Sequence, residues 1–468
     1  MALAILGTIV DTPEFGSIRG LEARTLVVVD KDGIIQERLD DDADNDAGAL
    51  QRRVEKLERD DNVEILRLGE REYLIPGFID SHVHASQWPF AGTGVDRPLM
   101  AQDGFLLKHA FPTEGMFQDK AVAKMWYGSF LDEMIKQGTT TAVIHLTSHR
   151  QACNVLVDLA VERRGPRCYV GKVNMDTFHP HPEGTKESLD ETEAFIARTL
   201  QIGKANHNLV IPVVTPRFIP TCSKDLLKGL GGLAKQYDIP TQTHMSETID
   251  ELDFSRNIYP DKTDAEVLLE VGILKSPSIM AHCTHMVQGE KELMKKVGAA
   301  VSHCPMSNFF FAKEALPVRQ LIQKDGVVVT LSTDVAGGYH PSMLNAMRTA
   351  VLASKTLQFK RDVRSIFPQN NPDQASVTED ELRERHDLTH FDALYLATAA
   401  GAKALARSDI GVFDVGCQLD AVVLGADPTV QRFDGGTAES RQDVFQKILC
   451  LGDDRNVKRV FVRGVQLK

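Results

Sequence analysis

The sequence predicts an α/β protein, a (β/α)8 TIM-like barrel with a small β-sandwich domain built from both ends of the chain. Through the middle of the chain, apolar segments alternate with amphipathic helical segments, as in βα units on a parallel sheet. Both ends are instead rich in short strand patterns. Histidines, acids or an arginine follow six of the eight predicted central strands. Barrel enzymes carry their active sites at these carboxyl ends.

The first part of the small domain is predicted to comprise residues 1–73. Strand patterns recur in it, at residues 3–10, 24–29 and 63–68. The acidic run Asp40–Asp46 is interpreted as a solvated loop, since charge runs usually face water. Ala49–Glu58 is predicted to form a short polar helix.

The barrel is predicted to span residues 74–404. Its eight candidate strands are Ile75–His84, Thr139–His145, Arg167–Met175, Leu209–Thr215, Pro240–Met245, Ser278–His285, Ala299–Cys304 and Val327–Asp334. Helical patterns lie between most of them, for example at Lys120–Gln137, Ala152–Arg163, Leu189–Ala205, Lys224–Tyr237 and Lys291–Val297. Eight βα units with a break at each end favour a closed barrel over an open, doubly wound sheet.

The end of the chain returns to strand patterns, and residues 405–468 are predicted to complete the small domain. Between the last barrel strand and this segment, helical patterns are interrupted by a polar stretch near Arg361–Asp387. This stretch is interpreted as a surface insertion without a catalytic role. A glycine-rich turn follows Asp334, but it lacks the lysine and the spacing of a P-loop.

Composition narrows the class of partner. The 468-residue chain has a formal net charge of −12, which argues against binding to nucleic-acid backbones or anionic lipid surfaces. It has no signal-peptide pattern and no apolar run of membrane-spanning length. The seven cysteines are scattered, with no Cys-x-x-Cys pair, as in reduced proteins of the cytosol. We therefore expect a soluble cytoplasmic protein that acts on a neutral or zwitterionic small molecule.

The chemical signal begins with His82 and His84 at the end of the first barrel strand. Alternate side chains of an extended strand share a face, so both imidazoles point the same way. A lone His-x-His pair is about as often structural as metal-binding. Here His244 and Asp334 end the fifth and eighth strands, and three imidazoles with one carboxylate suit zinc or ferrous iron.

Glu247 follows His244 by three residues and is expected to reach the same pocket. A metal ion in such a site lowers the pKa of a water molecule towards neutrality. A nearby carboxylate can take a proton from that water and return it to a ring nitrogen and a leaving amine. The sequence thus points to metal-assisted hydrolysis with Glu247 as the proton shuttle.

Three interpretations of His282, at the sixth strand, stay open. It could bind a second metal, stabilise a tetrahedral intermediate, or pack in the core, and the second is favoured. Two-metal barrels of this kind usually need a carboxylate or carbamylated lysine at the fourth strand, where this chain has Pro216-Arg217, so one metal is expected. Other histidines are interpreted as packing or supporting groups (His145, His285, His303) or as loop residues (His179, His181, His340).

These motifs resemble the amidohydrolase superfamily. Pro76–His84 resembles the signature of its first strand, His244–Glu247 its fifth, and Ser332–Asp334 its eighth. Ile410–Leu424 resembles the stretch where its small β domain resumes. Within the superfamily, four stretches are similar to the guanine deaminases, namely His84–Gln87 with Phe90-Ala-Gly, Thr215–Phe218, Asp334–Tyr339 and Phe445–Arg455.

The resemblance implies hydrolysis of guanine to xanthine and ammonia, with water attacking C2, at one zinc ion per chain in a homodimer. It implies that the metal ligands are His82, His84, His244 and Asp334. It also implies catalytic roles for Glu247, His282 and Asp334, which helps to orient the water. It places the substrate against Gln87, Arg217, Phe218 and His282. An arginine donor suits the carbonyl O6 of guanine, whereas adenine carries an amino group there.

Two other readings compete with this one. A related hydrolase on the same barrel would act on another aminopurine, a pterin or a triazine. A non-catalytic scaffold would keep the barrel but lack some ligands, and here every candidate ligand is present. A third chemistry, that of zinc deaminases with His-x-Glu followed by Pro-Cys-x-x-Cys, is excluded: His181-Pro-Glu183 matches its first half, but the second half does not occur.

Overall fold

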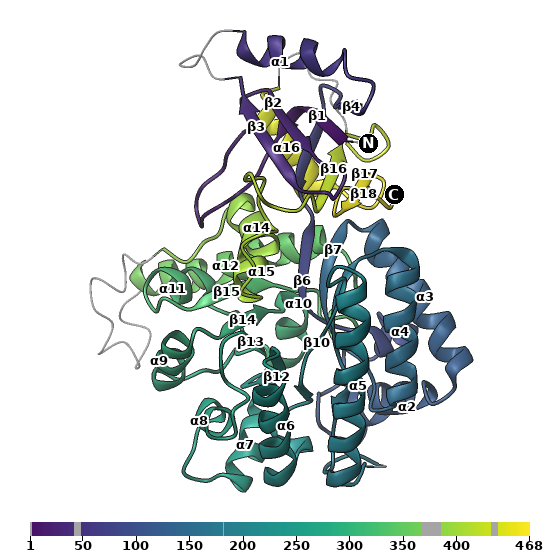
Figure 1. Cartoon of the computed structure of the whole chain (residues 1–468). Helices are drawn as coiled ribbons and strands as arrows, with labels where there is room; N and C mark the ends of the chain where they lie inside the picture. Colours follow the sequence, from purple (N-terminus) through teal and green to yellow (C-terminus); the bar gives the residue numbers. More distant parts are fainter. Residues whose placement is uncertain (1, 42–47, 181, 367–384, 432–438) are drawn as a thin grey trace.

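The computed structural model describes residues 2–41, 48–180, 182–366, 385–431 and 439–468. Strands from both ends of the chain form one sheet, and Figure 1 shows the two termini together beside it, at one end of the molecule. Its strand order is β18-β17-β16-β5-β1-β2-β3, with β4 paired to β1. These strands are β1 (Ala2–Ile9), β2 (Thr25–Val29), β3 (Ile35–Asp40), β4 (Val63–Arg67), β5 (Glu72–Pro76), β16 (Ala421–Gly425), β17 (Val457–Val462) and β18 (Val465–Gln466).

The terminal sheet joins the chain ends because their apolar strand residues face one core. Ile5, Val27, Leu74 and Val423 are each at most 1% exposed and belong to the same apolar cluster. Strand β16 pairs antiparallel with β5, with Val423 opposite Leu74. The prediction that the two ends meet in one β structure is confirmed.

The central part of the chain holds parallel strands in three hydrogen-bonded groups, β10-β8-β7-β6, β11-β9 and β12-β13-β14-β15. The strands are β6 (Phe78–His84), β7 (Thr139–His145), β8 (Arg167–Gly171), β9 (Val173–Asn174), β10 (Val210–Pro212), β11 (Thr215–Pro216), β12 (Thr241–Met245), β13 (Ser278–His282), β14 (Ala300–His303) and β15 (Val328–Leu331). All eight predicted central strands are present as strands or strand pairs, so the α/β class is confirmed.

Helices connect and cover these strands (Figure 1). The α-helices are α1 (Ala49–Leu57), α2 (Phe111–Met116), α3 (Lys120–Lys136), α4 (Arg150–Arg163), α5 (Thr185–Ala205), α6 (Lys224–Gln236), α7 (Ile249–Ile258), α8 (Asp264–Glu270), α9 (Gln288–Val297), α10 (Pro305–Ser307), α11 (Val318–Gln323), α12 (Met343–Ile366), α14 (His390–Ala397), α15 (Ala399–Ala404) and α16 (Arg441–Leu451). Short 3-10 or π turns are η1 (Ala85–Phe90), η2 (Leu106–Ala110), η3 (Ile219–Thr221) and η4 (Asn308–Ala312). The predicted helices match α1, α3, α4, α5, α6 and α9 to within a few residues.

The predicted first strand, Ile75–His84, is in fact two strands that meet at Gly77. Strand β5 belongs to the terminal sheet, and β6 is the first of the parallel strands. A side chain at position 77 would lie 2.1 Å from Thr140 Oγ1, so only glycine lets the chain pass from one sheet to the other this close to β7.

The predicted third and fourth strands are also divided, into β8 with β9 and β10 with β11. A β-carbon at Gly171 would lie 1.8 Å from Thr215 Oγ1, which again requires glycine at the break. The acidic run Asp40–Asp46 and the insertion near Arg361–Asp387 lie largely outside the described residues. Within the described residues, no helix is both long and apolar enough to cross a membrane.

Candidate active site

Four predicted ligands meet at the carboxyl ends of the parallel strands. His82 and His84 end β6, His244 lies in β12, and Asp334 follows β15 by three residues. Asp334 Oδ1 lies 3.2 Å from His82 Nε2 and 3.4 Å from His84 Nε2. The Nε2 atoms of His84 and His244 are 3.1 Å apart. All four side chains are buried, which brings the predicted ligand set together in one place.

These donors fit a metal ion. The carbonyl oxygen of Arg217 lies 2.7 Å from His244 Nδ1 and can only accept a hydrogen bond, so Nδ1 carries the hydrogen and Nε2 presents a lone pair. Both ring nitrogens of His82 are buried, and no described residue forms a hydrogen bond of regular geometry with either of them. Ligand atoms of His82, His84 and His244 all lie within 4.8 Å of one another. A cation at this point would take one nitrogen lone pair from each of the three rings.

The pKa shifts of these four side chains also favour the forms that bind a metal ion. Burial lowers the pKa of His84 to about 4 and lowers that of His244 well below its usual value. Burial likewise lowers the pKa of His82. Burial alone would raise the pKa of Asp334, but contacts with His82 and His84 hold it well below its usual value. Neutral imidazoles and an ionised carboxylate are the forms that bind a metal.

Buried polar groups hold the ligands in position. Asp80 accepts hydrogen bonds from the backbone N–H of Thr333 at 3.1 Å and from its hydroxyl, which joins β6 to the segment that carries Asp334. A backbone hydrogen bond makes the same connection, since the N–H of Asp334 donates to the carbonyl of His82 at 3.0 Å. Asp334 has φ 51° and His282 has φ 67°, left-handed values that are uncommon for residues with side chains. Such backbone strain gathers at functional sites.

Glu247 and His282 lie beside the ligands, as predicted. His282 Nε2 is 3.6 Å from Glu247 Oε2 and 3.9 Å from Asp334 Oδ2, while its Nδ1 lies 3.0 Å from Asn308 Oδ1. Burial, and then the charge of Asp334, raises the pKa of Glu247 well above its usual value. A carboxyl group with a raised pKa can hold a proton and release it to a reacting atom.

A cavity of about 380 Å³ opens beside these groups. The predicted substrate residues Gln87, Arg217 and Phe218 line it together with Glu247 and His282. Further apolar side chains complete the wall, among them Leu99, Phe105, Leu106 and Phe311. The cavity therefore combines an apolar lining with a few convergent polar groups, as small-molecule sites do.

Glu114, in α2, is a site residue that the sequence did not indicate. It is 3% exposed and accepts hydrogen bonds from Arg217 Nη1, at 2.8 and 2.9 Å, and from Gln87 Nε2 at 2.9 Å. Gln87 Oε1 in turn accepts from the backbone N–H of Ala336 at 3.3 Å. One carboxylate thus fixes both predicted polar substrate residues, Arg217 and Gln87. The signal in the sequence was weak, because Glu114 lies on a short helix far from every strand end.

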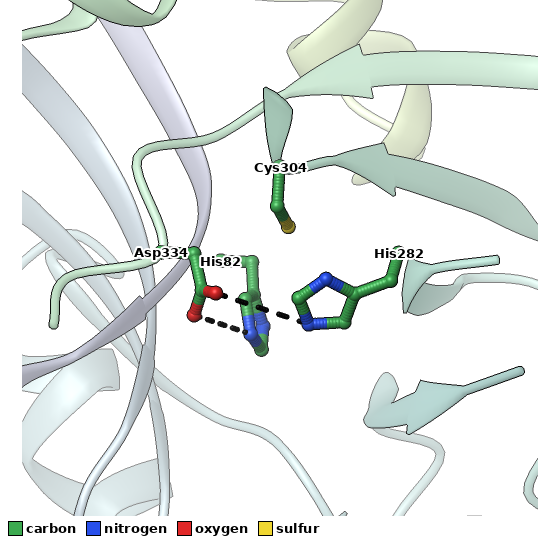
Figure 2. Close-up of side chains that lie close together, drawn as sticks. All are labelled: His82, His282, Cys304 and Asp334. Carbon is green, nitrogen blue, oxygen red and sulfur yellow. Dashed lines mark ion pairs between the residues drawn. The ribbon is translucent and has the colours of Figure 1, made fainter. Parts of the chain in front are cut away.

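Cys304 is a second residue that the prediction left out. Figure 2 shows its thiol above His82, His282 and Asp334, and one ligand atom from each of the four lies within 4.8 Å of the others. His145 and His303 are buried nearby, and neither ring nitrogen of either residue has a hydrogen-bond partner in the part of the chain that the structure describes. His145 lies 4.7 Å from His82, ring centre to ring centre.

Comparison with known proteins agrees with this geometry. Residues 73–467 match the model of the amidohydrolase family. The chain belongs to the amidohydrolase family. Within it, a guanine deaminase of Dictyostelium discoideum is 35% identical over 472 residues, covering 99% of this chain and 97% of that protein. A guanine deaminase of Homo sapiens is 36% identical over 413 residues, covering 86% and 85%.

This amidohydrolase also shares its whole fold with a solved relative. The crystal structure of guanine deaminase from C. acetobutylicum, with guanine bound in its active site, superposes with a TM-score of 0.83 at 28% identity and covers 100% of both chains. The guanine deaminases are therefore the branch of the amidohydrolases to which this chain belongs.

Proposed function

We propose that this protein hydrolyses guanine to xanthine and ammonia. The observation that carries the proposal is the pairing of a buried His82, His84 and His244 cluster with a cavity lined by Arg217 and Gln87, in a chain related over nearly its full length to guanine deaminases. Arginine N–H groups match the acceptor atoms O6 and N7 of guanine. A buried donor left unpaired would penalise adenine at the same position.

His82, His84, His244 and Asp334 are proposed to hold one zinc ion. When bound, zinc lowers the pKa of water and supplies a nucleophile near neutral pH. Glu247 takes a proton from the water that adds to C2 and passes it to ring nitrogen N3. The new C2 hydroxyl then gives up its proton, which goes to the amino group, so the C–N bond breaks, ammonia leaves and the C2 carbonyl of xanthine forms. Asp334 helps to orient the water, and His282, whose Nδ1 lies against Asn308 and whose Nε2 lies 3.6 Å from Glu247, stabilises the reacting centre.

Arg217, Gln87 and Phe218 are proposed to bind the purine, with Glu114 behind them as a positioning residue. Glu114 accepts hydrogen bonds from both side chains, and the remaining N–H groups of Arg217 and Gln87 stay available to the substrate. Because the negative charge of Glu114 balances the positive charge of Arg217, the pocket suits a neutral base.

We further infer that the parallel strands of residues 74–404 close into a (β/α)8 barrel, and that residues 1–73 and 405–468 form a small β-sandwich domain. Backbone hydrogen bonds between the separate groups of strands support closure. The N–H of Gln242 in β12 donates to the carbonyl of Val214, just before β11, at 3.0 Å, and the N–H of His84 at the end of β6 donates to the carbonyl of Val335, after β15, at 2.8 Å. A homodimer is proposed as well. Leu352 and Phe359 of α12 and Leu451 of α16, each more than half exposed, support an apolar contact surface.

A substrate panel tests the activity. Ammonia release is measured with guanine, adenine, cytosine and 8-oxoguanine, and with a pterin and a triazine. The proposal predicts that guanine gives the highest kcat/KM by a wide margin. A preference for adenine, the pterin or the triazine would keep the hydrolase and reject the assignment of Arg217 and Gln87.

A further inference from the structure

A second group of ligand atoms lies beside the first. His82, His282, Cys304 and Asp334 converge on one space in Figure 2, and all four side chains are buried. Imidazole nitrogen and thiolate sulfur together suit soft divalent ions such as zinc and cadmium. This group differs from the proposed zinc ligands in containing a cysteine, and it takes His282 in place of His84 and His244.

The two oxygens of Asp334 face different groups. Oδ1 lies 3.2 Å from His82 Nε2, whereas Oδ2 lies 3.9 Å from His282 Nε2. One carboxylate can therefore contact an ion on each side, as bridging carboxylates do in two-metal sites. His82 can give a nitrogen to one ion at a time, and the first ion takes it. His282, Cys304 and Asp334 remain for a second ion, with Glu247 Oε2 3.6 Å from His282 Nε2.

We propose that His282, Cys304 and Asp334 form a second, inhibitory site for a soft divalent cation. The Cys304 thiol has weak partners to give up, the carbonyl oxygen of Ser302 at 3.4 Å and the hydroxyl of Ser332 at 3.1 Å. When its sulfur binds the ion, the S–H bond breaks and the proton leaves to solvent, with no change of oxidation state. An ion held there engages His282 and lies against Glu247, the two groups that act on the substrate.

The inhibition part of this inference rests on the proposed function, but ion binding does not. Holoprotein is titrated with cadmium(II) while the ultraviolet charge-transfer band of a cadmium–thiolate bond and the turnover of guanine are recorded. The first site contains no cysteine, so exchange of its ion for cadmium produces no such band. We expect the band to reach the intensity of one cadmium–thiolate bond per chain, over the same cadmium concentrations at which guanine turnover falls.

Two variants assign the sulfur. Cys304→Ser should lose the band and shift half-inhibition to a cadmium concentration more than about 10-fold higher, since losing even an outer partner of a ligand costs a metal site about this much. Cys450→Ser is the matched control, because Cys450 Sγ lies 2.9 Å from His390 Nε2 and forms another thiol–imidazole contact. It should leave both readouts unchanged. Cys304→Ala serves if Cys304→Ser does not fold.

Several outcomes would overturn the proposal. Inhibition without a thiolate band would place the ion elsewhere, and a band that persists in Cys304→Ser would assign it to another cysteine. Absence of any band in the wild type would reject the site outright. If guanine is not a substrate, the band in wild type, Cys304→Ser and Cys450→Ser still decides whether Cys304 binds the ion.

Discussion

Both ends of the parallel strands hold a buried arginine paired with a carboxylate. At the carboxyl ends, Arg217 pairs with Glu114 at 2.8 Å, with side chains 2% and 4% exposed. At the amino ends, Arg167 pairs with Asp420 at 2.9 Å, with side chains 0% and 3% exposed. Chemistry and burial are nearly the same, so neither marks a functional site by itself.

The surroundings of the two pairs differ. Arg217 lines a cavity together with the histidine cluster, and Glu114 also holds Gln87 in that cavity. Arg167 begins β8 and donates to Gln418 and Asp420, just before β16, so this pair fastens the parallel strands to the terminal sheet. We therefore expect a functional charge pair to be distinguished by a cavity and by potential metal ligands beside it. The following predictions test that distinction.

Glu247→Gln should have the largest effect. The amide keeps the shape of the side chain but cannot take a proton from water, so kcat should fall by about 10²–10⁴-fold, the usual contribution of a proton-transfer group. Metal content should stay at the wild-type value, because Glu247 is not among the proposed ligands. Turnover and bound metal are measured on the same sample, and near-normal turnover would remove Glu247 from the mechanism.

Arg217→Ala should follow. It removes a donor to the substrate, and kcat/KM for guanine per folded molecule should fall by about 10- to 100-fold, since a hydrogen bond to a charged group contributes about 1.5–3 kcal/mol. It also leaves the Glu114 carboxylate buried without its cation, so the free energy of unfolding should fall by about 3–5 kcal/mol. Unchanged guanine kinetics would contradict the pocket assignment.

Glu114→Gln should have a smaller effect on the same reaction. The amide oxygen can still accept from one donor, but the charge that holds Arg217 is lost. We expect KM for guanine to rise more than kcat falls, because the change loosens the binding residues and leaves Glu247 in place. Glu37→Gln, at the surface pair with Arg53, is the matched control. The positioning role would be rejected if Glu37→Gln changed KM and kcat as much as Glu114→Gln does.

Arg167→Ala should have the smallest effect on catalysis. It breaks a pair as buried as that of Arg217, so the free energy of unfolding should fall by a similar amount, about 3–5 kcal/mol. Turnover per folded molecule should match the wild type, because the pair lies at the opposite ends of the strands. Denaturant unfolding and kinetics on folded protein measure the two quantities, and a selective loss of kcat/KM would contradict the comparison.

The convergence of the proposed metal ligands could be predicted because strand geometry places them. His82 and His84 share a face through the two-residue period of β6, and His244 and Asp334 come at or just after strand ends, where parallel strands bring distant residues together. The apolar alternation likewise gave the order of the strands and most helices. These are local patterns, which can be recognised in a single sequence.

Glu114 and Cys304 could not be predicted in this way. Glu114 reaches Arg217 from a short helix across 103 residues of sequence, and no periodic pattern connects the two. Cys304 is one of seven scattered cysteines, and nothing in the sequence around it distinguishes it from a thiol that packs in an apolar core. The break between β5 and β6 was also missed, because Gly77 is required by contact with Thr140 rather than by a turn in the sequence. Such features depend on tertiary packing.

Zinc reconstitution tests the central claim most directly. Protein stripped of metal by a chelator is reloaded with increasing zinc, and guanine turnover is plotted against bound zinc per chain. We predict no turnover without metal and a linear rise that ends at one zinc per chain, with excess zinc then inhibiting. Full turnover by the metal-free protein, or metal-loaded protein that releases no ammonia from guanine, would contradict the account.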